Sequence, residues 1–158
     1  MSKSPIKSPL SEADKEITGN ALQATLVDLV DLSLIAKQAH WNVVGSNFRS
    51  AHLQLDELVN TARQYVDEVA ERANTIGISP NGKAKTVVES SGVPEYPDNW
   101  QSVESTVAAI VDILSALIER LRRRIDETDK SDLVTQDLLI EITRALEEAH
   151  WMWQAQQA

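Results

Sequence analysis

Two histidines and several acidic residues carry the side chains best suited to chemistry in this chain. Together with Trp41 they occur in the order His40, Trp41, His52, Asp56, Asp67 and Glu71. Imidazole and carboxylate groups are common ligands of metal ions in proteins. The chain has no cysteine, so nitrogen and oxygen atoms must hold any metal. The spacing predicts a metal site, and two solvated acid pairs with incidental histidines are the alternative interpretation.

The predicted helices place these ligands too far apart for one metal ion in one chain. Residues 43–45 interrupt a first helix just after His40, and residues 47–76 have the pattern of one long helix. On that helix His52 and Asp67 are separated by about 22 Å, at about 1.5 Å per residue. Asp56, Asp67 and Glu71 nevertheless lie about 40°, 60° and 100° from His52, on one stripe. We therefore expect a two-fold dimer that brings the acidic pair of one copy to the histidines of the other.

The remaining chain has the pattern of an all-α, ferritin-like four-helix bundle. Apolar residues recur at helical spacing in four segments: about 11–40 after the N-cap Ser11, 47–76 up to Gly77, 98–128, and 132–156. Gly19 is a weak point within the first. Short links join the first two helices and the last two, whereas a long crossover with breakers at residues 77–99 separates the pairs and could hold one short helix at 86–91. No strand pattern competes. Residues 1–10 are expected to form a mobile tail, before a domain at 11–158.

Composition excludes several function classes. The chain has 158 residues, 42% hydrophobic content and a formal net charge of −9. Such a charge favours cations and opposes binding of nucleic acid or an anionic membrane by the folded body, although acidity can also serve solubility alone. No segment reaches the roughly 18 apolar residues of a membrane span, and no apolar leader is present. We expect a cytoplasmic protein.

Two other motifs are weaker than the opening set. Glu147 and His150 form one Glu-x-x-His motif of the kind that ferritin-like di-iron proteins carry twice, but Lys37 and Arg49 stand where a partner motif needs Glu. His150 is therefore interpreted as a helix-end or interface residue. Residues 77–83 resemble the start of a phosphate-binding loop, yet they follow a helix instead of a strand.

Residues 36–48, then His52 and Asp56, then residues 67–72 closely resemble the Dps family, the DNA-binding proteins from starved cells, also called mini-ferritins. The resemblance extends from about residue 17 to 153. It implies that His40, His52, Asp67 and Glu71 are ferroxidase ligands, two histidines from one subunit and the acids from its two-fold mate. It also implies a dodecameric hollow shell that oxidises Fe²⁺, preferably with hydrogen peroxide, stores the ferric mineral and protects against oxidative damage.

The resemblance suggests roles for neighbouring residues, each with a simpler alternative. Asp56 is expected to bind a second metal or orient a water, or to be a plain solvated acid. Trp41 is expected to donate an electron to an oxidising intermediate, or to serve packing. Glu57 is a weaker candidate for mineral nucleation. In this family acidic residues near the turn between the last two helices line a pore for Fe²⁺, which makes Asp137, Asp126 and Asp132 pore candidates; stabilisation of a helix start by its dipole explains the same residues.

DNA binding is the main rival function. Family members that compact DNA usually use lysine-rich tails, whereas this tail offers only Lys3, Lys7 and the terminal amine. Twelve tails on one shell would gain avidity, but the acidic body repels phosphate. The alternatives are therefore a nucleoid-associated, DNA-compacting shell with secondary iron chemistry, and a shell re-used as a metal-dependent hydrolase, which the sequence neither supports nor forbids.

Overall fold

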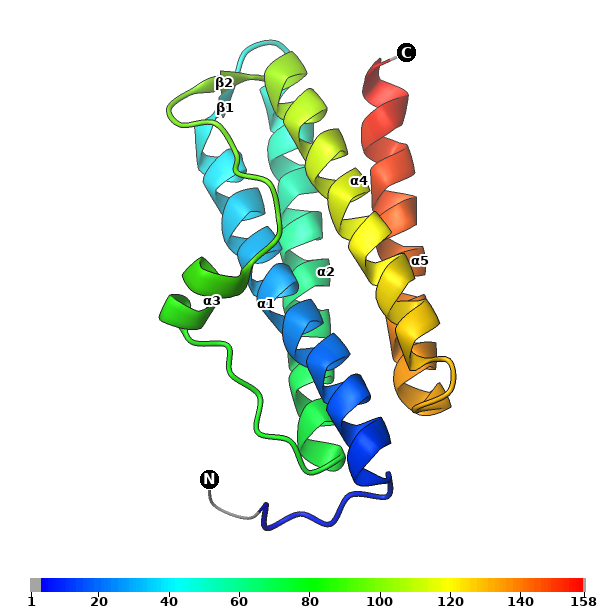
Figure 1. The fold of residues 1–158 in the computed structure, drawn as a ribbon. Helices are drawn as coiled ribbons and strands as arrows, with labels where there is room; N and C mark the ends of the chain where they lie inside the picture. The colour runs from blue at the N-terminus through cyan, green and yellow to red at the C-terminus, as the bar shows by residue number, and fades with distance from the viewer. Residues whose placement is uncertain (1–3, 158) are drawn as a thin grey trace.

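The computed structural model describes residues 4–157 and shows four long helices packed side by side (Figure 1). They are α1 (Glu12–Asn42), α2 (Phe48–Thr75), α4 (Val103–Thr128) and α5 (Leu133–Gln154), and a short 3-10 turn η1 (Ala155–Gln157) follows. The predicted crossover, which connects α2 to α4, runs along the outside of the bundle beside α1 and carries one short helix, α3 (Ala84–Ser90). The predicted ferritin-like bundle is confirmed, including its crossover helix, which begins two residues before the expected position.

Capping side chains begin three of the long helices. Ser11 accepts a hydrogen bond from the backbone N–H of Asp14 at 3.2 Å, as predicted. Asp132 caps α5, also as predicted. The start predicted for α4 at residue 98 was several residues too early, because Asn99 adopts a left-handed φ of 65° and Ser102 is the N-cap. Asn47 precedes α2 with φ of 60°, but its side chain makes no capping hydrogen bond.

A two-residue strand pair, which was not predicted from the sequence, closes one end of the bundle. Strand β1 (Val43–Val44) pairs in parallel with β2 (Gln101–Ser102). The chain turns after β1 at Gly45, whose φ of 110° suits glycine. This pairing ties the α1–α2 turn to the start of α4.

The core fills the space between the four long helices. Leu22, Leu55, Leu114 and Leu139, one from each helix, are fully buried. Gly19 is more than a weak point in α1, because a Cβ there would lie 2.2 Å from the side chain of Ile78. Because Gly19 has no side chain, the segment after α2 can pack closely against α1.

A charged cluster is buried within the bundle. The Asp28 side chain has no exposed surface, and it accepts hydrogen bonds from Arg124 at 2.6 Å, Arg120 at 2.9 Å and the Gly92 N–H at 3.1 Å. Burial alone would raise the pKa of Asp28, but the hydrogen bond from Arg120 and the charge of Arg124 outweigh it, so that the pKa is lowered. The cluster joins α1, α4 and the crossover.

The segment before α1 contacts the bundle within the described residues. Leu10 packs against the core, and a Cβ at Gly77 would lie 2.9 Å from the backbone oxygen of Ile6. The mobility predicted for residues 1–10 remains a prediction, and Lys3 lies outside the described residues. Among the described helices, none has the length and apolar character needed to cross a membrane.

Candidate metal centre

His40 and His52 lie face to face at the α1–α2 turn. Their ring centroids are 3.6 Å apart with an interplanar angle of 22°. His40 is buried and comes from the last turn of α1, whereas His52 is half-buried in the first turns of α2. The ring of Phe48 packs edge-on to His52 at 6.1 Å. The tight turn between the helices thus brings together two residues that are twelve apart in sequence.

Reciprocal hydrogen bonds orient both imidazoles. His40 Nδ1 donates to the carbonyl oxygen of His52 at 2.8 Å, and His52 Nδ1 donates to that of His40 at 2.9 Å. A carbonyl can only accept, so Nδ1 carries a proton in both rings, and Nε2 is the ring nitrogen left to bind a metal. Such an anchored Nδ1–H is the arrangement that metal-binding histidines use. The pair is thus prepared to present two nitrogen ligands.

Asp56 is paired with a lysine. Lys37 Nζ lies 2.5 Å from Asp56 Oδ1, and His40 Nδ1 lies 3.4 Å from the same oxygen. The hydrogen bond from Lys37 lowers the pKa of Asp56. The carboxylate is therefore not simply solvated, because one of its two oxygens is engaged by the ammonium of Lys37. Lys37 was not assigned a role from sequence, because its partner lies on another helix.

Asp67 and Glu71 lie on α2, away from the histidines. The helix is unbroken from Phe48 to Thr75, so the separation of about 22 Å between His52 and Asp67 follows from its rise. Both carboxylates are exposed, and among the described residues neither accepts a hydrogen bond or joins an ion pair. The described residues contain no group of three or more histidine and acidic residues that could hold a metal within one chain.

An apolar groove borders the histidine end of α1. It is lined by residues of α1, α3 and the crossover, among them Leu34, Gln38, Trp41 and Val88. Leu34 is 54% exposed, Trp41 67% and Val88 86%, so three large apolar side chains of the groove are largely open to water. Trp41 therefore does not pack in the core of its own chain. The two roles considered for Trp41, packing and electron donation, remain predictions.

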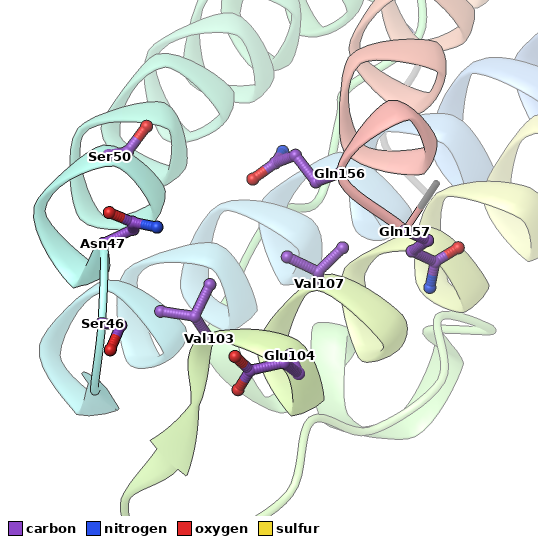
Figure 2. Close-up of a pocket in the computed structure, with 8 residues that line it drawn as sticks. All are labelled: Ser46, Asn47, Ser50, Val103, Glu104, Val107, Gln156 and Gln157. Atoms are coloured by element: carbon purple, nitrogen blue, oxygen red, sulfur yellow. The ribbon is translucent and has the colours of Figure 1, made fainter.

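A second pocket at this end of the bundle contains none of the predicted ligands. Figure 2 shows it between the start of α2, the start of α4 and the C-terminal turn, with Ser50, Glu104 and Gln156 among its lining residues. It offers hydroxyl and amide groups and one carboxylate. We therefore do not interpret it as the metal centre.

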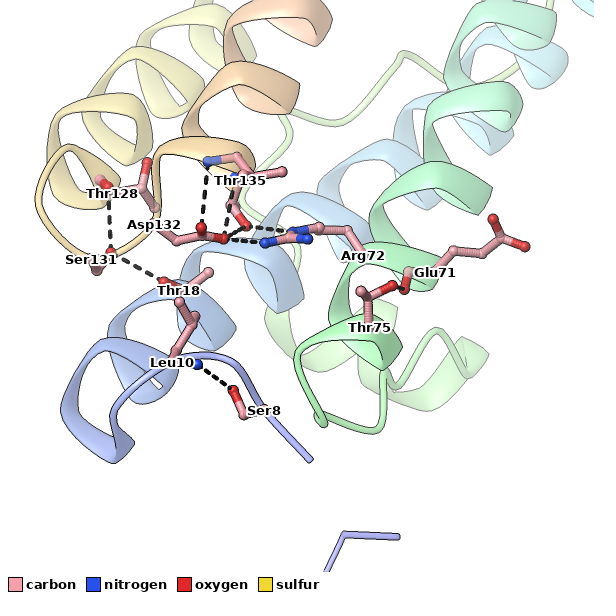
Figure 3. A network of polar contacts seen from close by, with 11 residues as sticks. Ser8, Leu10, Thr18, Glu71, Arg72, Thr75, Thr128, Ser131, Asp132 and Thr135 are labelled. Atoms are coloured by element: carbon pink, nitrogen blue, oxygen red, sulfur yellow. Dashed lines mark hydrogen bonds and ion pairs between the residues drawn. The ribbon is translucent and has the colours of Figure 1, made fainter. Parts of the chain in front are cut away.

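The acidic residues near the α4–α5 turn separate into two groups. Asp126 and Asp137 are exposed. Asp132 is buried; it caps α5 and forms an ion pair with Arg72 at 2.5 Å (Figure 3). Its carboxylate is thus engaged within the chain, which leaves Asp126 and Asp137 as the pore candidates with accessible carboxylates.

The remaining candidates lie away from the histidine pair. Glu147 accepts a hydrogen bond from Arg122 at 2.8 Å, and the buried Nε2 of His150 has no hydrogen-bond partner among the described residues. Glu57 is exposed and lines a small pocket between α2 and α5. Their roles stay predictions.

The ferritin-like domain family matches residues 19–158. The fine tangled pili major subunit of Haemophilus ducreyi is 38% identical over 146 residues, which cover 92% of this chain and 77% of that protein. The DNA protection during starvation protein of Mycolicibacterium smegmatis is 36% identical over 146 residues, covering 92% of this chain and 80% of its own.

Solved structures give the same result. The structure of Mycobacterium smegmatis Dps aligns with a TM-score of 0.92 at 35% identity and covers 98% of this chain and 94% of its own. The structure of Dps from Microbacterium arborescens in the high iron form aligns with a TM-score of 0.89 at 30% identity, and the alignment covers 96% of this chain and 98% of that chain. Together with the bundle and its crossover helix, these matches show that the chain belongs to the Dps family of ferritin-like proteins.

Proposed function

We propose that this protein is a ferroxidase and iron store that oxidises Fe²⁺ with hydrogen peroxide at sites shared by two copies of the chain. The observation that carries the proposal is the anchored histidine pair, in which both Nδ1 protons are held by carbonyl oxygens and both Nε2 atoms remain available. The acidic pair of the same chain is too distant to complete the site. Asp67 and Glu71 of a second copy would supply the two carboxylates.

The face that carries the histidine pair is also suited to a second copy. Leu34, Lys37 and Trp41 recur at helical spacing on α1, and Lys37 is bound to Asp56 of the ligand stripe on α2. The apolar groove and the stripe therefore border each other. Burying Leu34, Trp41 and Val88 against another copy would remove large apolar surfaces from water. One two-fold contact would thereby complete two equivalent sites.

The ligand set suits oxidation of iron as a substrate. Imidazole nitrogens accept Fe²⁺, and carboxylates stabilise the harder Fe³⁺ product. Hydrogen peroxide takes up two electrons, one from each of two Fe²⁺ ions, and two protons, and leaves as two waters. The protein's part is to hold Fe²⁺ at fixed ligands while the electrons are transferred. Oxidising iron in this way consumes peroxide and would protect the cell from oxidative damage.

Assembly into a dodecameric shell and storage of the ferric product are further parts of the proposal. The net charge of −9 and the exposed carboxylates of Asp126 and Asp137 would attract Fe²⁺. The Microbacterium arborescens relative is described in a high iron form, which supports iron as the metal. We place the activity in the cytoplasm.

DNA compaction is the second candidate, favoured by the name of the Mycolicibacterium smegmatis relative, a DNA protection during starvation protein. In this chain Lys7 is exposed, which would allow contact with phosphate. The net charge of −9 opposes it. Iron oxidation is therefore the leading function, and nucleoid association is the alternative.

The test is Fe²⁺ oxidation by the purified assembly, with peroxide and with oxygen, followed by absorbance of the ferric product. We expect His52→Ala and Asp67→Ala to reduce the rate to that of Fe²⁺ in buffer while the assembly stays intact by size-exclusion chromatography. Glu68→Ala is a matched control, because Glu68 neighbours Asp67 but accepts a hydrogen bond from Gln64 instead. Wild-type rates in His52→Ala or Asp67→Ala would refute the assignment.

A further inference from the structure

The last turns of α2, which carry Asp67 and Glu71, are tied to the start of α5 by a polar network. Arg72 donates from Nη2 to Asp132 at 2.5 Å and from Nε to the hydroxyl of Thr135 at 3.0 Å. The same hydroxyl donates to Asp132 at 2.6 Å, and Asp132 also accepts from the backbone N–H of Thr135 at 3.2 Å. Figure 3 shows Arg72 directed into this network and Glu71 directed away from it.

The network is shielded from water. The Arg72 side chain is 16% exposed and that of Asp132 is 7% exposed, so solvent screens the ion pair far less than a surface pair. Thr18 and Ser131 extend the polar contacts toward α1 with a hydrogen bond of 3.1 Å. Asp132 also accepts a hydrogen bond from the backbone N–H of Val134 at 3.4 Å, so this acceptor of Arg72 is itself held in place.

Adjacent residues on a helix are fixed relative to one another. Glu71 and Arg72 differ by about 100° around α2, so a constraint on Arg72 also sets the direction of Glu71 and, one turn earlier, of Asp67. The hydrophobic effect that buries the apolar face of α2 is not directional. The guanidinium, by contrast, makes two hydrogen bonds of fixed geometry.

We propose that Arg72 is a positioning residue for the carboxylate half of the metal centre, holding the rotation of α2 at which Asp67 and Glu71 face the histidines of a second copy. The inference rests on the proposed function. Replacing a residue that orients metal ligands typically lowers metal affinity or activity by about 10- to 100-fold. We expect a loss in that range, mainly as weaker metal binding.

The experiment compares the assembled wild type with Arg72→Gln, Arg72→Lys and Thr135→Val. Zn²⁺, which is not oxidised, serves as the probe in calorimetric titrations, and Fe²⁺ oxidation is measured over a range of Fe²⁺ concentrations. Arg122→Gln is the matched control, because it removes another arginine–carboxylate pair between helices, on α4 and α5, far from Asp67 in sequence.

We expect Arg72→Gln to assemble, to bind Zn²⁺ about 10- to 100-fold more weakly at an unchanged number of sites, and to show a raised KM for Fe²⁺ with a smaller change in kcat. Arg72→Lys should recover part of the affinity, because it keeps the charge toward Asp132. Thr135→Val removes one acceptor of Arg72 and should change the affinity in the same direction, by less. Arg122→Gln should behave as wild type.

Wild-type affinity and kinetics in Arg72→Gln would overturn the inference. If that variant fails to assemble, wild-type behaviour of both Arg72→Lys and Thr135→Val would overturn it instead. Failure of the proposed function is recognised separately, because then Asp67→Ala would bind Zn²⁺ and oxidise Fe²⁺ as the wild type does.

Discussion

Co-producing two inactive variants, His52→Ala and Asp67→Ala, should restore part of the Fe²⁺ oxidation that each lacks alone. On the unbroken helix α2 the two positions are about 22 Å apart, so one metal ion cannot bind both residues of one chain. If the histidines of one chain work with the acids of its two-fold mate, a mixed dimer holds one doubly damaged site and one intact site.

The size of the recovery follows from random pairing. With equal amounts of the two chains, about half of the dimers are mixed, and each has one intact site of two, so about one quarter of the wild-type sites are complete. The two variants would be produced together with different affinity tags, and the chain ratio measured by mass spectrometry. The initial rate of ferric product formation should then be about a quarter of the wild-type rate.

A second mixture is the matched control. His40→Ala with His52→Ala should recover nothing, because both histidines must come from the same chain and every chain lacks one. The reasoning is refuted if the first mixture is no more active than its separate components. It is refuted equally if the two mixtures recover the same activity.

Three further predictions concern stability and DNA. Asp28→Ala should lower the free energy of unfolding by about 3–5 kcal/mol in denaturant titrations, because it leaves Arg124 buried without its partner; Glu147→Ala, which breaks a largely exposed pair, should cost about 0–1 kcal/mol. The pKa of Asp28 is lowered from 3.8 by folding, so its contribution is complete above that pH and is lost as the pH falls through the lowered value. Melting temperatures of the wild type and Asp28→Asn should therefore converge below pH 3.8, and a constant difference would contradict this assignment. In mobility-shift titrations at physiological salt, DNA retardation should be weak and should disappear when Lys3 and Lys7 are replaced by glutamine. These substitutions are milder than deleting the segment, because Leu10 packs on the core. Retardation that is unchanged by the substitutions would place DNA binding elsewhere.

Local sequence signals predicted most of the helices well. Ser11 and Asp132 cap α1 and α5 as expected, and Gly77 follows the end of α2 with φ of 78°. These features depend on residues close together in the chain, so capping preferences and periodicity suffice to find them. The start of α4 was predicted too early because the pairing of Gln101 and Ser102 with β1 depends on a distant segment.

The candidate site also has features that the sequence predicts and features that depend on how the helices pack. The ligand types, their stripe on α2 and their separation along it follow from sequence, because helix geometry is regular. The hydrogen bonds that orient the histidines do not, since they need the two helices to be packed together.

By itself, then, the sequence determined which residues could bind a metal and that Asp67 lies too far along α2 to join His52 in one chain. Only the tertiary structure decided how those residues are supported: Lys37 on Asp56, Arg72 on Asp132, and the fully buried Asp28 with its arginines. The physical reason is that charge pairing between helices depends on which faces pack together, and helical periodicity reports the apolar faces but not the polar partners across them.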